Sequence, residues 1–270
     1  MSLAKSTRRV GLTRLDGPVA EVCEDAIAVE EPLEIRVGGR SVAVVMRTPG
    51  HDRELAAGFL VTEGIVRRRE EVLDLVYCRG DGGAPEENIL DVLLAPGVAV
   101  DLEKLTRHVF TSSSCGICSK ATIAAVRAQF PAIAAPLAPR REVLAALPEK
   151  LRAAQAAFDA TGGLHACALC TADGGLVAVR EDVGRHNALD KVVGAAFFAE
   201  SLPLRGHILL VSGRVSFEIM QKALAAGVPC VAAISAPTSA AVEFARESGQ
   251  ALVGFLRGGR MNVYAGTLAG

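Results

Sequence analysis

The chain has no tryptophan and only two tyrosines, and aromatic residues make up 4% of its 270 positions. So few aromatic rings argue against a surface on which nucleic acid bases stack. The charge is also nearly balanced, because 29 lysines and arginines face 30 aspartates and glutamates and leave a net charge of −1. Proteins that coat nucleic acid or anionic lipid need a surplus of basic residues, so both classes are disfavoured.

Long apolar runs are missing as well. The longest ones, such as residues 228–236, are much shorter than the roughly 20 residues that a membrane-spanning helix needs. The first ten residues, MSLAKSTRRV, are polar and basic and no apolar stretch follows them, so we expect no secretory signal. Seven cysteines, an odd number, fit a reducing compartment. These features predict a cytoplasmic protein.

What the chain does have is enough apolar sequence for a packed core, with 50% hydrophobic and 22% charged residues. Apolar and polar residues alternate over 33–37 and 42–46 around Gly38 and Gly39, which predicts a hairpin with a glycine turn. A helix is expected over 51–63, ended by Gly64. Two more strands are expected, at 72–78 and 89–94. With residues 1–20 as a leading tail, residues 1–110 read as a small N-terminal α+β domain.

The rest of the chain follows a different pattern. Residues 111–162 are expected to form a cysteine-containing loop and a helical connector, with a helix at 120–129 and a second helical stretch at 141–159 interrupted by Pro148. From residue 163 onward, apolar runs alternate with helical patterns: runs at 164–170, 176–180, 207–211, 228–234 and 251–256, and helices at 186–199, 216–226 and 238–247. This alternation predicts an α/β domain over 163–270 with a mostly parallel central sheet.

The first chemical candidate is the pair Cys115 and Cys118, in a small polar stretch just before the expected helix. A helix N-terminus and the nearby Lys120 both favour thiolates, and two thiols three positions apart can exchange sulfur. The alternative is that they are unreactive thiols or half of a metal site.

A second pair, Cys167 and Cys170, raises the possibility of a four-thiolate zinc site. However, 48 residues separate Cys118 from Cys167, against about 15–20 in typical zinc sites of this kind. Cys167 and Cys170 also fall within an apolar strand, where side chains three apart point to opposite faces. We therefore interpret them as buried small hydrophobes and predict no bound metal.

Three glycine-containing corners follow expected strands and carry basic residues. Arg185 and His186 come after Gly184 at a helix start, where anions bind, and Gly213 and Arg214 occupy a second such corner. The third closes the last strand: Phe255, Leu256, Arg257, Gly258, Gly259 and Arg260. In open α/β sheets, ligands gather at the carboxyl ends of strands, so these corners predict a site for a phosphate-containing ligand. The alternative is that these corners bind no ligand: a solvated helix start capped by Asn187, together with exposed Arg-Gly turns.

Taken together, these residues resemble one known family. The matching blocks, in chain order, are Thr48-Pro49-Gly50-His51-Asp52, Gly58-Phe59-Leu60 with Glu63-Gly64, Ser114-Cys115-Gly116-Ile117-Cys118, Thr161-Gly162-Gly163-Leu164-His165, residues 181–191, Ser212-Gly213-Arg214 and residues 255–264. The sequence is similar to the FdhD-type formate dehydrogenase accessory proteins, which carry sulfur for the molybdenum cofactor.

The resemblance implies a sulfurtransferase. A cysteine desulfurase would load a persulfide onto the Cys115–Cys118 loop, with Cys115 as the persulfide-bearing residue and Cys118 as its partner. The sulfur would then pass to a bis(molybdopterin guanine dinucleotide) molybdenum cofactor before that cofactor enters formate dehydrogenase, with residues 255–260 in the segment assigned to cofactor binding. It also implies a cytidine-deaminase-like larger domain and a homodimer.

Two departures from the family and from deaminases bear on this interpretation. Family members carry Ala and an aromatic residue where this chain has Cys167 and Cys170, so the second pair is not expected to be shared machinery. The H-x-E and P-C-x-x-C zinc signature of deaminases is missing, so deaminase chemistry is not implied. Two other classes stay open: a non-enzymatic chaperone that binds the cofactor while its cysteines carry no sulfur, and a structural zinc protein.

Overall fold

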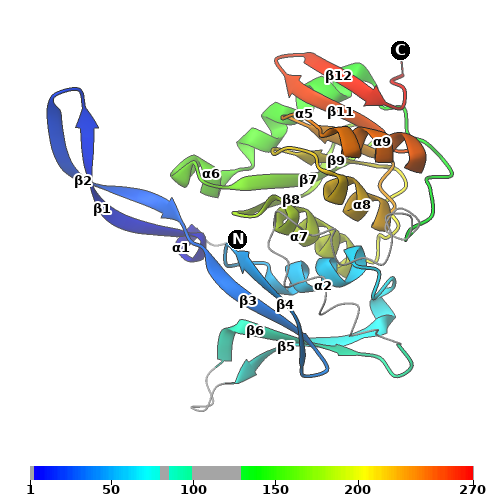
Figure 1. The fold of residues 1–270 in the computed structure, drawn as a ribbon, viewed down its shortest axis with the longest axis horizontal. Helices are drawn as coiled ribbons and strands as arrows, with labels where there is room; N and C mark the ends of the chain where they lie inside the picture. Colours follow the sequence, from blue (N-terminus) through cyan, green and yellow to red (C-terminus); the bar gives the residue numbers. More distant parts are fainter. Residues whose placement is uncertain (1–2, 80–84, 99–128, 270) are drawn as a thin grey trace.

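The structure is a computed structural model that describes residues 3–79, 85–98 and 129–269. Within these residues, a four-stranded and a six-stranded sheet enclose a layer of helices, and a two-stranded hairpin projects from the body (Figure 1). This arrangement places the four-stranded N-terminal sheet on one side of the helix layer and the six-stranded sheet on the other.

The four-stranded sheet has the order β4-β3-β6-β5. Its strands are β3 (Glu31–Val37), β4 (Arg40–Arg47), β5 (Val72–Arg79) and β6 (Pro85–Leu94). The predicted glycine-turn hairpin is confirmed, because β3 and β4 pair antiparallel and both Gly38 and Gly39 have positive φ. Helix α2 (Asp52–Thr62) packs on the sheet and ends as predicted before Gly64, whose φ is 77°. A 3-10 turn, η1 (Arg69–Glu71), leads into β5.

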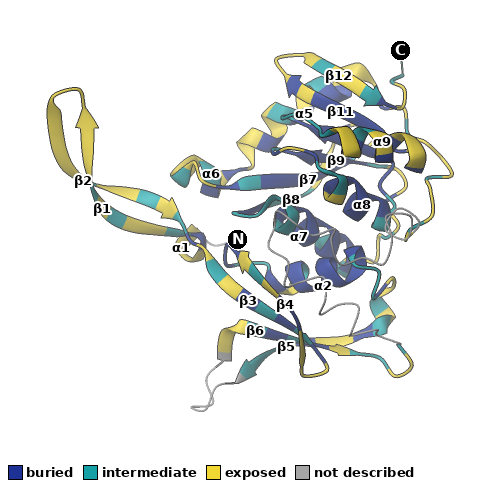
Figure 2. Ribbon diagram, in the orientation of Figure 1, coloured by how far each residue is buried: buried dark blue, intermediate teal, exposed yellow. Residues whose placement is uncertain are grey.

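The expectation of a tail over residues 1–20 is wrong. A short helix, α1 (Leu3–Ser6), is followed by β1 (Thr7–Asp16) and β2 (Val19–Ala28), which pair antiparallel over their whole length. Both faces of this hairpin are largely exposed (Figure 2), with Leu15 at 74% and Val22 at 85%. A strand with no buried face has no reason to alternate apolar and polar residues, so its sequence carries no period-2 signal.

The six-stranded sheet has the order β12-β11-β10-β9-β7-β8. Its strands are β7 (His165–Thr171), β8 (Leu176–Asp182), β9 (His207–Val211), β10 (Cys230–Ala233), β11 (Ala251–Arg257) and β12 (Arg260–Ala265), close to the predicted runs. The prediction of a mostly parallel sheet is wrong, since only β9, β10 and β11 run parallel. The connections β7–β8 and β11–β12 are too short for a parallel crossover and can only make hairpins. The fold is therefore a mixed α/β fold.

Helices cover both faces of this sheet. Helices α7 (Arg185–Phe198), α8 (Phe217–Ala225) and α9 (Ser239–Ser248) lie on one face, and α5 (Arg141–Ala153) lies on the other, followed by the short α6 (Ala156–Thr161). The predicted interruption at Pro148 is wrong, because α5 continues through this residue. The stripe of Leu144, Leu147 and Leu151 is fully buried on the sheet, and this burial offsets the roughly 3 kcal/mol that an internal proline costs.

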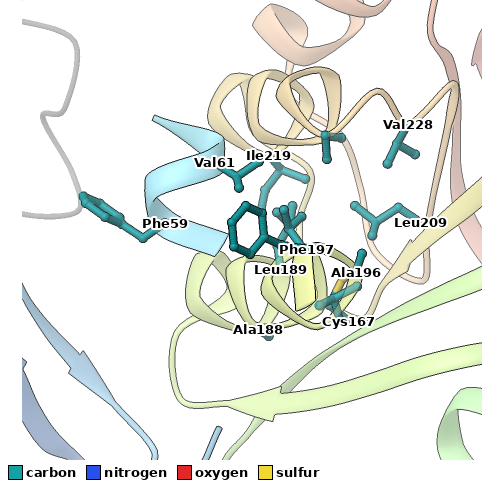
Figure 3. Packing of buried hydrophobic residues seen from close by; sticks show 14 of the residues in the cluster. Phe59, Val61, Cys167, Ala188, Leu189, Ala196, Phe197, Leu209, Ile219 and Val228 are labelled. Atoms are coloured by element: carbon teal, nitrogen blue, oxygen red, sulfur yellow. The ribbon is translucent and has the colours of Figure 1, made fainter. Parts of the chain in front are cut away.

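The two halves of the chain meet where α2 crosses α7. A Cβ atom on Gly58 would overlap the carbonyl oxygen of Asp190, and one on Gly194 would overlap that of Glu54, so the helix backbones touch at these glycines. Around the crossing, one hydrophobic cluster includes Val61 of α2, Leu189 and Phe197 of α7, and Leu209 of β9 (Figure 3). The domain boundaries expected near residues 110 and 162 stay a prediction.

No helix among the described residues combines the length and the apolar character needed to cross a membrane.

Candidate functional site

The strand directions bring the predicted corners to one edge of the six-stranded sheet. Strands β8, β9, β10 and β11 end at this edge, and β7 and β12 begin there. We call it the carboxyl edge. Its residues are His165, Asp182 to His186, Ser212 to Arg214, Ile234, Ser235 and Phe255 to Arg260. The sequence placed most of these residues at strand ends but could not show that they share one edge.

Asp182 organises the corner that follows β8. Its carboxylate accepts hydrogen bonds from the backbone N–H groups of Gly184 at 2.8 Å and Thr48 at 3.1 Å and from Asn187 Nδ2 at 2.9 Å. It also forms an ion pair of 2.6 Å with Lys191, and both side chains are 0% exposed. Asp182 and Lys191 therefore hold the start of α7 against the Thr48 turn and are unavailable to a ligand.

Arg185 and His165 lie side by side across Gly213. An ideal Cβ placed on Gly213 would be 3.1 Å from His165 Nδ1 and 3.7 Å from Arg185 Cβ. The Nε atom of Arg185 is buried, and no hydrogen-bond partner for it exists among the described residues. Burial and the Arg185 charge lower the pKa of His165 below its usual value. This corner thus brings a guanidinium donor and an imidazole close together around Gly213, where an added Cβ would be crowded by the His165 ring.

His186 is the second imidazole of the corner. Its Nε2 atom lies 3.2 Å from Glu218 Oε2 and 3.5 Å from Ser216 Oγ at the start of α8. Burial, followed by the charges of Arg185 and Lys222, lowers the pKa of His186 to about 3. The imidazole is therefore neutral at pH 7, and its Nε2 atom faces the Glu218 carboxylate.

Residues 255–260 form the other end of the carboxyl edge. Phe255 is 40% exposed and has the left-handed φ of 54°, at a bulge in the β11–β12 pairing. Such conformations are strained for non-glycine residues and cluster at functional sites. Gly258 and Gly259 both have positive φ and make the turn between β11 and β12. Leu256 is fully buried in the core, so only its backbone could meet a ligand.

Gly213 and Phe255 lie two strand positions apart on the same edge. Gly213 follows β9 and Phe255 lies in β11, with β10 between them, and adjacent strands are about 4.8 Å apart, which gives a separation of about 10 Å. The loop after β10 links them, since Arg257 Nε donates to the Ile234 carbonyl at 3.1 Å and Val215 N to that of Ala236 at 3.1 Å. Arg214, Arg257 and Arg260 are exposed, so the edge suits an elongated anionic ligand.

The cysteines fall into two sets. Cys115 and Cys118 lie outside the described residues. Cys167 and Cys170 are fully buried on opposite faces of β7, which confirms their interpretation as core residues. Burial raises the pKa of Cys167 well above its usual value, that of Cys170 to about 11 and that of the buried Cys230 to about 12. These three thiols stay protonated at pH 7 and are poor nucleophiles.

No group of three His, Cys, Asp or Glu side chains suitable for a metal ion occurs within residues 3–79, 85–98 and 129–269.

The sequence places His165 only in a block that matches the family and does not assign it to the corner. Its position opposite Gly213 depends on the β7–β9 pairing, and no local pattern reveals that pairing.

Comparison with known proteins identifies the family. The FdhD/NarQ family model matches residues 28–268, nearly the whole chain. This chain belongs to the FdhD/NarQ family. The match includes both ends of the carboxyl edge and the Cys115–Cys118 segment, so the resemblance seen in the sequence is confirmed.

Curated relatives named sulfur carrier protein FdhD match over almost their full length. The relative from Streptomyces coelicolor is 52% identical over 269 residues, covering 98% of this chain and 95% of the relative. The one from Mycobacterium tuberculosis is 51% identical over 271 residues, 98% of both chains. Among solved structures, a candidate formate dehydrogenase accessory protein from Desulfotalea psychrophila matches with a TM-score of 0.75 at 22% identity, over 97% of each chain. At that identity the structural match supports the FdhD/NarQ fold alone.

Proposed function

We propose that this chain is a sulfur carrier for formate dehydrogenase maturation. It accepts sulfur from a cysteine desulfurase as a persulfide on Cys115 and passes it, with the help of Cys118, to the bis(molybdopterin guanine dinucleotide) molybdenum cofactor. The observation that carries this proposal is the similarity to sulfur carrier proteins at about half identity over 98% of the chain. In this role the protein acts as a cytoplasmic sulfurtransferase and a homodimer.

The carboxyl edge supports the cofactor part of the proposal. The cofactor enters as a substrate with phosphate groups and guanine bases, and the edge offers the corner at Gly213 and, about 10 Å away, Phe255 at the start of the residue 255–260 turn. Arg185 Nε has no partner among the described residues, as expected of a donor reserved for a ligand. The exposed Phe255 ring and the guanidinium groups of Arg257 and Arg260 are suited to a base and its phosphates.

The acid–base properties of the thiols favour Cys115 and Cys118 as the sulfur-bearing residues. Burial keeps the three core cysteines protonated, so Cys23 and Cys78 are the remaining candidates besides Cys115 and Cys118. Neither belongs to a C-x-x-C pair. A persulfide needs a thiolate that can attack the sulfane sulfur of the desulfurase and expel its cysteine thiolate.

Loading is tested by incubating the protein with a cysteine desulfurase and cysteine and then measuring peptide masses. The peptide containing Cys115 and Cys118 is expected to gain about 32 Da, the mass of one sulfur atom. Peptides with Cys23 or Cys78 serve as internal controls and should stay unmodified. If the Cys115–Cys118 peptide keeps its mass while the desulfurase loads another acceptor, the chain is a cofactor-binding chaperone whose cysteines carry no sulfur.

A further inference from the structure

Gln129 is the first residue that the structure describes after Cys118, and its side chain bridges two helices. Its Nε2 atom donates to the carbonyl oxygen of Glu63, the C-cap of α2, at 3.1 Å, and its Oε1 atom accepts from Gln221 Nε2 of α8 at 3.0 Å. The buried Lys222 of α8 also pairs with Glu63 at 3.4 Å. Gln129 therefore attaches the chain to two helices that an ion pair already holds together.

The next residues fit against two glycines that follow helices. An ideal Cβ on Gly64, after α2, would lie 3.3 Å from the Phe130 ring, and one on Gly249, after α9, would lie 3.2 Å from the Ile133 carbonyl oxygen. The Ile133 N–H donates to the Ser248 carbonyl at 2.8 Å, and both Phe130 and Ile133 pack against the larger hydrophobic cluster. The chain thus stays in contact with the fold over five residues, which we call the anchor.

The anchor, residues 129–133, lies close to the carboxyl edge. Helix α8 begins just after the corner at residues 212–214, and Gln221 is the fifth residue of this helix, about 6 Å along the helix axis from its start. Gln221 is 7% exposed, so packing fixes its amide. The chain after Cys118 is therefore attached beside the edge to which the proposed function assigns the cofactor.

The anchor shortens the chain between the cysteines and their first described attachment on this side. Gln129 follows Cys118 by eleven residues, so their Cα atoms are at most about 40 Å apart. After residue 133, the next backbone hydrogen bond among the described residues is the one that Pro139 accepts from Ala269, twenty-one residues after Cys118. Without the anchor, the tether would be nearly twice as long.

We propose that the anchor is a positioning element for the transfer of sulfur from Cys115 and Cys118 to a cofactor bound at the carboxyl edge. The inference rests on the proposed function, which requires these cysteines to reach both a desulfurase and the cofactor. It also gives a role to the block Glu63-Gly64, which matches the family but has no part in the proposed chemistry: this block holds the chain that follows the cysteines.

The two sulfur steps depend differently on the tether. Transfer to a bound cofactor is intramolecular, so its rate follows the effective concentration of the cysteines at the edge. For a moving tether this concentration falls as about the −3/2 power of the tether length, and an increase from eleven to twenty-one residues lowers it about threefold. Loading by a desulfurase is bimolecular and does not depend on the tether.

The test removes the anchor side chains together, as Gln129→Ala, Phe130→Ala and Ile133→Ala. The protein is loaded by a cysteine desulfurase, separated from it and mixed with saturating molybdenum cofactor, so that a single turnover is followed. We expect transfer to slow at least about threefold, with the loading rate unchanged. Release of the persulfide sulfur to cyanide as thiocyanate should also be unchanged, because cyanide is a free small molecule. Gln221→Ala, which keeps the anchor residues, should slow the same step by less.

The matched control combines Phe198→Ala, Ser201→Ala and Leu202→Ala. Phe198 and Leu202 pack on the same hydrophobic cluster as the anchor, and Ser201 Oγ donates to a backbone carbonyl, but these residues connect α7 to β9 and do not tether the cysteines. The control should transfer sulfur at the unsubstituted rate. Circular dichroism checks that each variant is folded, and Gln221→Ala alone decides if the triple anchor variant is not.

Two results would overturn the inference and leave the sulfur carrier function intact. One is an equal transfer rate in the anchor variants and the unsubstituted protein. The other is a loss that extends equally to loading and thiocyanate release, which would indicate general damage to the fold. An unsubstituted protein that takes up no sulfur would overturn the proposed function and the inference together.

Discussion

A cell whose only copy of this protein carries Cys115→Ala is expected to produce inactive formate dehydrogenase. The thiol at this position is the acceptor in the proposed reaction, and an alanine has no nucleophile with which to take the sulfur. Formate oxidation by the client enzyme should fall to the level seen without the protein. Cys23→Ala is the matched control, because it removes a half-buried thiol from the projecting hairpin and should leave the client active.

Cys118→Ala separates loading from delivery. Delivery as sulfide requires two electrons, and the second thiol can supply them: the Cys118 thiolate attacks the inner sulfur of the Cys115 persulfide, forms a disulfide and expels hydrosulfide. A cellular thiol then reduces the disulfide for the next cycle. We expect this variant to gain the persulfide mass yet leave formate dehydrogenase inactive. Full client activity in Cys115→Ala would favour the non-enzymatic chaperone, whereas full activity in Cys118→Ala alone would show that delivery does not need the second thiol.

Gly194→Ala is expected to destabilise the protein by more than about 3 kcal/mol, at the upper end of the usual range for overpacking. An added Cβ overlaps the backbone carbonyl of Glu54, and a backbone cannot rotate away as a side chain can. Helices α2 and α7 would have to separate, which would expose the cluster shared by the two sheets. Denaturant unfolding followed by circular dichroism measures the loss.

Gly206→Ala is the control for this substitution. Gly206 has no atom within 4 Å of an ideal Cβ and no positive φ, so its replacement should change the free energy of unfolding by about 0.5 kcal/mol or less. Equal stability of the two variants would show that the helices do not cross as closely as described. A Gly194→Ala protein that does not fold at all would agree with the account.

Several elements could be predicted from local sequence because each has a strong short-range signal. The β3–β4 hairpin has two glycines between alternating strands, and the runs at 207–211 and 251–256 are apolar because both faces of the sheet are covered. Strand direction is different, since it depends on the length of the connections. The connection between β7 and β8 has only four residues, with Gly174 at a φ of 83°, and this length indicates an antiparallel pair. The prediction of a mostly parallel sheet relied on the apolar runs and gave this length too little weight.

The candidate site shows the same limit. The sequence shows that residues 181–191 contain many charged and polar side chains. Only the structure shows which of them stabilise the fold and which can bind a ligand. Asp182 and Lys191 form a fully buried ion pair that shapes the corner, whereas Arg185 keeps a buried donor without a partner among the described residues. Glu181 accepts the N–H groups of Ala157 and Phe158 and so caps α6. Charged residues in one motif thus serve the fold as well as the ligand.

The central claim is that a sulfur atom held by Cys115 and Cys118 reaches the molybdenum cofactor. The most direct test loads the protein with sulfur from isotopically labelled cysteine, removes the desulfurase and excess cysteine, and then adds the cofactor. The account predicts that the label leaves the Cys115–Cys118 peptide and appears in the cofactor fraction in matching amounts. Label that stays on the protein while the cofactor acquires sulfur from another source would contradict it.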